Sequence, residues 1–388
     1  LFLVPGSVFK YWSTAMYVGM HFENRNEINF VSMSIQYSNL HKWMADLPFH
    51  TDSSRLENEH VLDVEYRIPD SARAEINDGF TLEIGYGFTY DMFTIEEEFK
   101  IEQTTSVIIR NETARGINNF MDVHRCFRYF LMLAMLHTVH PLSVKATINE
   151  DPNNSVIVFP SIQLYENIPK ISTHDMLFLF PQISGNFQVF IRAWFELWGG
   201  FRNTLTVYFA TLLDKGNTTI EIQFQRIAQV LEYYHRGRFP DTRLMPENDY
   251  ETMINDMRTK LAGDRREIQY VNRFVNQGNG PNLEQRIRQL VDMCPLSFND
   301  ANEERGQFAI DVMNTRNLHA HEIDERRERA VTDPLRLIFL THQMMALMEA
   351  YLITELPFPE PQRNNLIIRN RDKRNFARDH HEEPEDND

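Results

Sequence analysis

The sequence contains only two cysteines, Cys126 and Cys294, in 388 residues. Two cysteines so far apart in the chain exclude a disulfide framework and a site built from several thiolates. They fit a reducing compartment, and we therefore expect a cytoplasmic protein.

Long apolar runs are also missing. The nearest to one is the segment 130–136, Phe-Leu-Met-Leu-Ala-Met-Leu, which His137 follows. A membrane-spanning helix needs about 18 or more apolar residues, so this segment predicts a core helix and no membrane contact is expected. The chain begins at Leu1 rather than Met, and residues 1–4 lack a basic flank, so we expect a fragment without a signal peptide.

Positive charge is scarce, since 39 Lys and Arg stand against 55 Asp and Glu, a formal net charge of −16. Such a chain does not attract nucleic acid as a whole, so any contact with a polyanion must come from a local basic patch. Apolar residues are plentiful, at 42% of the chain, which is enough for sizeable cores. The length favours two domains.

The first half of the chain alternates apolar and polar residues with a period of two, which is typical of antiparallel strands covering a core on one side. The expected strands run through 31–37, 62–68, 82–90 and 93–101, with shorter ones near 107–109 and 156–159. A helix over 120–134 should pack on this sheet. A later helix through Trp194 and Trp198 is expected to stop at Gly199 and Gly200.

From about residue 218 the hydrophobic period is helical. Helices are expected near 224–237, 253–261, 268–275, 283–293 and 334–356. The sequence therefore predicts an α+β protein of two domains: an antiparallel β-rich domain with a packed helix over 1–205, and an all-α helical bundle over 215–358. Residues 360–388 show almost no hydrophobic pattern, and we expect a mobile, polar, charged tail there.

One segment has residue types suited to catalysis, Arg316-Asn317-Leu-His-Ala-His321. The sequence has no glycine-rich phosphate loop, nucleophile elbow or His-Glu-x-x-His zinc helix. In RNA the ribose 2′-OH is an internal nucleophile. A histidine can transfer its proton, and an arginine can hold the phosphate and offset charge that builds on it. These residue types therefore suit RNA cleavage without a metal or another cofactor.

Spacing alone does not single out this pair, because three other arginines precede a histidine at a similar gap. They are Arg55 before His60, Arg336 before His342, and Arg374 before His380. Only Arg316 and His321 lie between patterned helices. A five-residue helical step turns about 140°, so convergence of the two side chains needs a helix end, a bend or a partner chain. The alternative is a surface arginine and a helix-capping histidine.

The segment Thr315-Arg-Asn-Leu-His-Ala-His321, between two apolar helices, resembles the signature of HEPN domains and, more narrowly, of the ApeA-type HEPN family. The helix 224–236 resembles the opening helix of that family's C-terminal domain. The stretch Tyr37-Ser-Asn-Leu-His-Lys-Trp43 and the helix containing 130–133 resemble its β-rich N-terminal domain, which we expect to be sensory or regulatory.

The resemblance implies a metal-independent endoribonuclease that acts in bacterial defence against phage by abortive infection. It implies a homodimer formed through the helical domain, with RNA as the substrate (tRNA is one candidate) and not DNA. By position, Arg316 and His321 would be catalytic, supported by Asn317, and Glu232 and Tyr233 would line the same region. His319 lies outside the motif. Many HEPN domains are inactive, so the alternative is a non-catalytic scaffold that dimerises or docks a partner.

Two further features have competing interpretations. The stretch 258–288 holds seven basic residues against three acidic ones, either as an RNA contact or as a solvated helical face with internal ion pairs. The RNA-binding candidates are Arg236, Arg265, Arg266 and Arg273. The four tryptophans, Trp12, Trp43, Trp194 and Trp198, either form a stacking surface for a sugar or base, or anchor a core.

Overall fold

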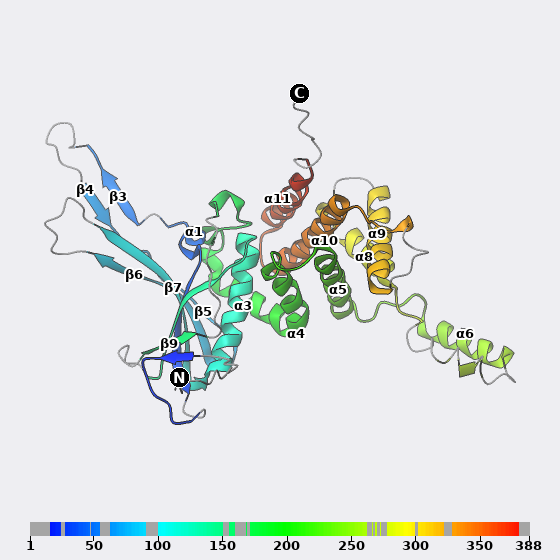
Figure 1. Cartoon of the computed structure of the whole chain (residues 1–388), viewed down its shortest axis with the longest axis horizontal. Coiled ribbons are helices and arrows are strands. Elements are labelled where there is room, and N and C mark those ends of the chain that lie inside the picture. Colours follow the sequence, from blue (N-terminus) through cyan, green and yellow to red (C-terminus); the bar gives the residue numbers. More distant parts are fainter. Residues whose placement is uncertain are drawn as a thin grey trace, which may run out of the picture. The chain divides into compact units, whose positions relative to one another are not determined.

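The computed structural model describes residues 16–24, 28–46, 48–54, 63–90, 100–149, 155–159, 168, 171–261, 266, 268–269, 272, 278–298, 302–321 and 328–379. The chain divides into two compact units, Leu1–Glu196 and Leu197–Asp388. The first is rich in antiparallel strands and the second is helical (Figure 1), which confirms the predicted α+β, two-domain class.

The first unit is built on a seven-stranded antiparallel sheet in the order β1-β9-β8-β2-β7-β6-β5. Its strands are β1 (Met16–Val18), β2 (Asn29–Tyr37), β5 (Ala72–Glu75), β6 (Phe80–Tyr90), β7 (Ile101–Gly116), β8 (Pro141–Thr147) and β9 (Ser155–Phe159). β3 (Phe49–Asp52) and β4 (Asp63–Tyr66) form a separate pair. The predicted strand over 93–101 falls mostly outside the described residues.

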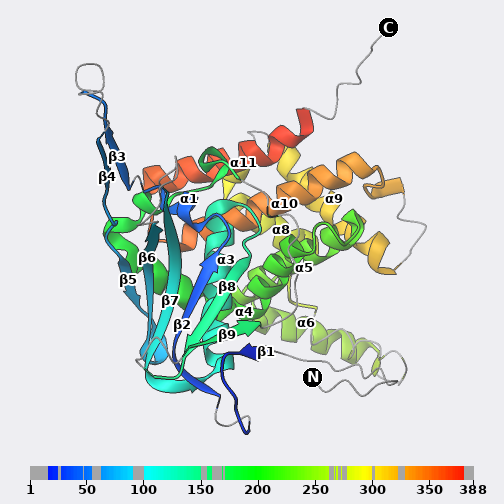
Figure 2. The same ribbon diagram turned by 60° about the vertical axis from the view of Figure 1, so that its left-hand side comes forward.

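Helix α3 (Ile117–Met135) covers one face of this sheet (Figure 2), as the sequence predicts. Alternate strand residues such as Met33, Ile84 and Ile109 are fully buried, because a period of two points them all to the covered side. Phe120 and Phe127 of the helix are also fully buried, and their rings pack against those of Phe80 in β6 and Tyr37 in β2. The short helix α1 (Leu40–Met44) adds another layer of core residues.

The segment that follows the sheet closes the core around α3. It contains short turns of 3₁₀ helix and the start of α4 (Phe187–Leu213). Trp194 of α4 is fully buried and donates from its indole nitrogen to the carbonyl of Cys126, at 2.8 Å. Trp43 likewise donates to the carbonyl of Phe178, at 3.0 Å. The stacking interpretation is therefore wrong for these two tryptophans, which anchor the core.

The expected helix stop at Gly199 and Gly200 is confirmed in part: α4 kinks at Phe201, whose φ of −126° and ψ of 24° are not helical, and a second helical segment continues to Leu213. A glycine in a helix interior costs about 1 kcal/mol relative to alanine. Beyond the glycines, Leu205 and Tyr208 are fully buried. Each large apolar side chain contributes about 1.5–3 kcal/mol when buried, which outweighs that cost.

The second unit contains the C-terminal part of α4 and six further described helices. These are α5 (Ile220–Arg238), α6 (Glu247–Lys260), α8 (Leu283–Met293), α9 (Asn302–His321), α10 (Pro334–Glu355) and α11 (Glu360–Asp379). Most of the predicted helix over 268–275 lies outside the described residues. α10 is the central helix and packs against α5 and α11.

One stretch of α10, Pro334–Thr354, is long and apolar enough to cross a membrane by length and composition alone. Of its most apolar window, 72% is buried, as in the core helix of a globular protein. This stretch is therefore weak evidence for a membrane span.

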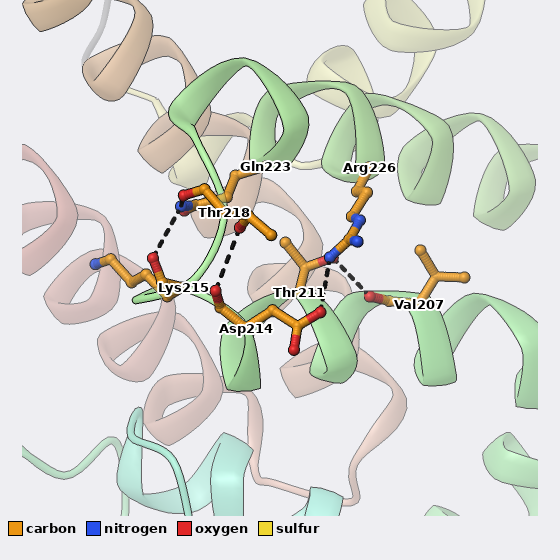
Figure 3. A network of polar contacts seen from close by, with 7 residues as sticks. All are labelled: Val207, Thr211, Asp214, Lys215, Thr218, Gln223 and Arg226. Atoms are coloured by element: carbon orange, nitrogen blue, oxygen red, sulfur yellow. Dashed lines mark hydrogen bonds and ion pairs between the residues drawn. The ribbon is translucent and has the colours of Figure 1, made fainter.

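The turn between α4 and α5 is held by side-chain hydrogen bonds (Figure 3). Gln223 donates to the carbonyls of Lys215 and Thr218, at 3.2 and 3.1 Å. Arg226 pairs with Asp214, at 3.0 Å. These contacts give partners to polar groups between the end of α4 and the start of α5. Backbone groups at helix ends lack partners within the helix.

The predicted polar tail from residue 360 is wrong over Glu360–Asp379, which form α11. Leu366 and Ile367 are buried, and Asn370 is 1% exposed. Most of the helix surface is charged, so its short buried stripe has too few apolar residues to give a periodic signal.

Candidate active site

The Arg316–His321 motif lies in the last turns of α9. Phe308, Val312 and Thr315 are buried on one side of this helix. The hydroxyl of Thr315 accepts a hydrogen bond from the backbone N–H of Val331, at 2.9 Å. The chain that leads into α10 is thereby fixed beside the motif.

Arg316 and His321 occupy different faces of α9. The helix continues to His321, so the five-residue step between them turns about 140°. Arg316 is half-buried, and it donates to the side-chain oxygen of Asn317 at 3.4 Å, which is long for a hydrogen bond. The side chain of His321 lies outside the described part of the structure. The bend that would bring the two together in one chain does not occur between them.

His319 stands closer to Arg316 on the helix surface, because a three-residue step brings side chains to neighbouring positions. Its ring packs 6.3 Å from that of Phe224 in α5. Its Nε2 is buried and has no hydrogen-bond partner among the described residues. The residue that sequence reasoning left outside the motif is therefore half-buried at the interface between α9 and the start of α5.

Glu232 lies towards the other end of α5. Its carboxylate pairs with Arg236 one turn on, at 2.6 Å. From Phe224, the neighbour of His319, to Glu232 the helix rises about 12 Å. Arg316 lies about one turn closer to Glu232 than His319 does, but among the described residues Glu232 bonds to Arg236 and not to Arg316. Tyr233 is exposed and bonds to Gln229 of its own helix.

α9 and α5 run antiparallel. His319 near the end of α9 meets Phe224 near the start of α5. At the other end of α9, Gly306 lies close to Arg288 of α8. α8 in turn contacts the end of α5, through Gln289 and His235. The end of α5 therefore lies nearer to the start of α9 than to His319 at its end.

The predicted RNA-binding arginines have different environments. Arg265 and Arg273 lie outside the described residues, and Arg266 and Arg236 are exposed. In the same basic stretch, Arg288 pairs with Glu284 at 2.9 Å. Part of this stretch is therefore the helical face with internal ion pairs that the sequence also allowed.

The structure also contains a polar cluster at the end of α5 that no sequence motif indicated. It contains Arg286, a buried arginine of α8, whose Nη1 lies 3.0 Å from Nδ1 of His235. Nε2 of His235 lies 2.9 Å from the side-chain oxygen of Gln289. Burial lowers the pKa of His235, and the neighbouring charges of Arg286 and Arg236 act in the same direction, against the hydrogen bond to Gln289. The sequence signal was the basic stretch that includes Arg286, but nothing in it indicated a partner 51 residues upstream.

No group of three or more His, Cys, Asp or Glu side chains with the arrangement of a metal site occurs in the described ranges. Arginine and histidine are the ionisable groups of the Arg316–His321 motif on α9. Together they can bind a phosphate and transfer a proton.

Two family models match the chain. The model described as ApeA N-terminal domain 1 matches residues 2–194, and the one described as Apea-like HEPN matches residues 226–362. The first lies within the β-rich unit and the second within the helical unit. The Arg316–His321 segment falls inside the second match. Comparisons with curated proteins and with solved structures gave no significant match.

Proposed function

Since the chain belongs to the ApeA-type HEPN family, with an ApeA N-terminal domain followed by an Apea-like HEPN domain, we propose that it is a metal-independent endoribonuclease. The observation that carries the proposal is the Arg316–His321 motif on α9, within the matched HEPN region. The family assignment also supports a role in defence against phage. The scarcity of cysteine favours the cytoplasm.

The chemistry follows from the substrate and two side chains. The ribose 2′-OH attacks the neighbouring phosphorus and displaces the 5′-oxygen of the next nucleotide, leaving a 2′,3′-cyclic phosphate. The attacking 2′-OH loses a proton and the leaving 5′-oxygen gains one, and His321 transfers a proton in this step. Arg316 binds the non-bridging phosphate oxygens with parallel hydrogen bonds and offsets their growing negative charge. Asn317, the hydrogen-bond acceptor of Arg316, restricts the orientation of the guanidinium group.

The positions of Arg316 and His321 on α9 favour a site formed by two chains. They lie about 140° apart on the helix, so one chain does not present both to the same phosphate. A dimer with its two-fold axis beside α9 would place the arginine of one chain opposite the histidine of the other. HEPN domains are often dimeric, which supports this arrangement.

A cleavage assay tests the proposal. Purified chain is incubated with total RNA and with tRNA, and cleavage is compared among the wild type, Arg316→Ala and His321→Ala. We expect each variant to lose about 100-fold or more in rate, because each lacks a group that acts in the transition state. Arg226→Gln is the control, since Arg226 lies on α5 and pairs with Asp214. Activity should persist in EDTA, and equal activity in all four proteins would reject the assignment.

The second candidate is a non-catalytic HEPN scaffold that dimerises or docks a partner. The net charge of −16 favours it, because the chain as a whole repels RNA. In that case the two alanine variants would match the wild type in every RNA assay.

A further inference from the structure

The end of α5 and the first turns of α8 enclose an arginine whose charge is not balanced by an ion pair. Arg286 is 9% exposed, yet it forms none of the ion pairs found among the described residues. Its Nε is buried without a hydrogen-bond acceptor in that part of the structure. Burying an arginine without a carboxylate or phosphate is costly, so binding of an anion at this position would be favourable.

His235 holds this arginine in place. A guanidinium group has only donors, so in the 3.0 Å contact Nδ1 of His235 accepts from Arg286. The ring is then neutral and carries its proton on Nε2, which donates to Gln289 at 2.9 Å. His235 is fully buried and cannot swing away. It is therefore a positioning residue for the guanidinium group of Arg286.

Two more arginines surround the same place. Arg236 and Arg243 both act on Arg286 as like charges, and Glu232 acts as an opposite charge. Glu232 is already bonded to Arg236, at 2.6 Å. Arg243 lies 3.8 Å from Glu247, whose carboxylate also accepts from Asn279. Three guanidinium groups thus share two carboxylates, and the largely exposed Arg236 and Arg243 give access from solvent.

From these contacts we infer that Arg286, Arg236 and Arg243 form a binding site for a backbone phosphate of the RNA substrate. This inference rests on the proposed function. A phosphodiester carries one negative charge and two free oxygens. This suits the planar guanidinium group of Arg286, which His235 holds by Nη1. Along α5, Arg236 lies about 18 Å from Phe224 and about 13 Å from the level of Arg316, so the site contacts a different phosphate from the one that is cut. It supplies local positive charge that a chain of −16 otherwise lacks.

The ordinary interpretation is that these residues only join α5 to α8. It explains the bond between His235 and Gln289, but a glutamine or methionine at position 286 would do the same without a buried charge. It also gives no reason for three arginines to gather where like charges repel. The phosphate interpretation accounts for both observations.

A binding assay on uncleavable RNA separates this site from catalysis. The probe is a fluorescent single-stranded 2′-O-methyl RNA, whose blocked 2′-oxygen cannot attack, titrated with the full chain at several salt concentrations. We expect Arg236→Gln to weaken binding about 5- to 10-fold and Arg286→Gln about 10-fold or more. Each should lower the slope of log affinity against log salt by about 0.7, the loss of one phosphate contact. The matched control is Arg226→Gln, which removes an arginine of the same helix that also pairs with a carboxylate.

Glu232→Gln supplies the opposite change. Glu232 competes with the phosphate for Arg236, so its neutralisation should tighten RNA binding by several-fold. A purely structural cluster predicts weaker or unchanged binding instead. Arg286→Gln is accompanied by a thermal melt, and the exposed Arg236→Gln decides the matter if the buried variant unfolds.

Each outcome bears on the inference. Unchanged affinity and salt slope in Arg236→Gln, or a wild-type chain without salt-dependent RNA binding, would overturn it. A nucleoside triphosphate offers the same chemistry, so ATP is titrated in parallel. Stoichiometric ATP binding that Arg236→Gln abolishes, with RNA binding unaffected, would also overturn it. The expected binding pattern in a chain that cuts no RNA would keep the site and reject the nuclease.

Discussion

The buried pair Tyr37 and His124 shows how a single titratable residue can be structural. The phenol oxygen lies 2.6 Å from Nδ1 of the imidazole, inside the core between β2 and α3. Burial raises the pKa of Tyr37, which therefore stays protonated and donates to the ring nitrogen. Burial also lowers the pKa of His124 to about 3, and the cations of Arg128 and Arg125 add to the effect. The two residues therefore pack in the core as neutral groups joined by a hydrogen bond.

His124 should make the first unit sensitive to acid. Its pKa is about 3 in the folded chain and about 6.5 when unfolded, so between these values the unfolded chain binds more protons. The contribution of His124 to stability is therefore complete above pH 6.5. It is lost at about 1.4 kcal/mol per pH unit as the pH falls towards 3. His124→Gln removes this titration, and urea unfolding at pH 7 and pH 5, followed by the fluorescence of the buried tryptophans, measures it.

The loss of stability between pH 7 and pH 5 is compared between the wild type and His124→Gln. The contributions of titrating groups that both proteins share therefore cancel. His140 and His342 also have pKa values lowered to about 4, and both are present in the variant. We expect the wild type to lose more stability than His124→Gln between pH 7 and pH 5. An equal loss in both proteins would mean that His124 does not stay neutral in the fold.

At the scale of whole elements, α11 is attached to α10 by a buried polar centre. Glu349 of α10 is 1% exposed and accepts from Tyr208 at 2.6 Å and from Asn370 at 3.0 Å. Arg374 of α11 binds the same carboxylate with two nitrogens. The carboxylate raises the pKa of Arg374 against the opposing effect of burial, so the pair stays charged. Asn370 and Arg374 thus give α11 a specific register on α10.

Breaking this pair should be far more costly than breaking an exposed one. Glu349→Gln leaves the charge of Arg374 buried without a carboxylate, and we expect it to lower the free energy of unfolding by about 3–5 kcal/mol. Asp214→Asn breaks the exposed pair with Arg226 and should cost less than about 1 kcal/mol. Urea unfolding of the two variants gives the comparison.

A double variant supplies the control for this prediction. Glu349→Gln combined with Arg374→Met removes both charges, and it should be more stable than Glu349→Gln alone. If the double variant is less stable than the wild type by the sum of the costs of Glu349→Gln and Arg374→Met measured singly, the two residues do not interact as the contacts indicate.

α11 and α9 also show where sequence patterns stop being informative. β6 and α3 were predictable because their buried residues repeat with the period of a strand or a helix. α11 was not, because Asn370 and Arg374 complete its buried side and look like surface residues in the sequence. In α9 the motif itself was found from residue types. That Arg316 and His321 lie on a continuous helix was not predictable, because a helix end between them was equally compatible with the sequence.

The whole molecule combines a large negative charge with local positive sites. The net charge of −16 limits indiscriminate binding of RNA, while Arg316 and the arginines at the end of α5 act at short range. Affinity for RNA should therefore depend on a few contacts and on geometry. The proposed nuclease site therefore requires two chains, since one α9 does not present Arg316 and His321 together.

Mixing two inactive variants tests whether the active site is shared between chains. If Arg316 comes from one chain and His321 from the other, a heterodimer of Arg316→Ala and His321→Ala has one site with both native residues and one with neither. In a two-fold dimer with random exchange, half of the dimers are mixed and each keeps one site of two, so activity should return to about a quarter of the wild-type level. The two variants are unfolded together, refolded as a mixture, and assayed on tRNA beside each variant treated alone. A mixture as inactive as its components would place both residues of each site in one chain, and His321 would then have to reach Arg316 across the end of α9.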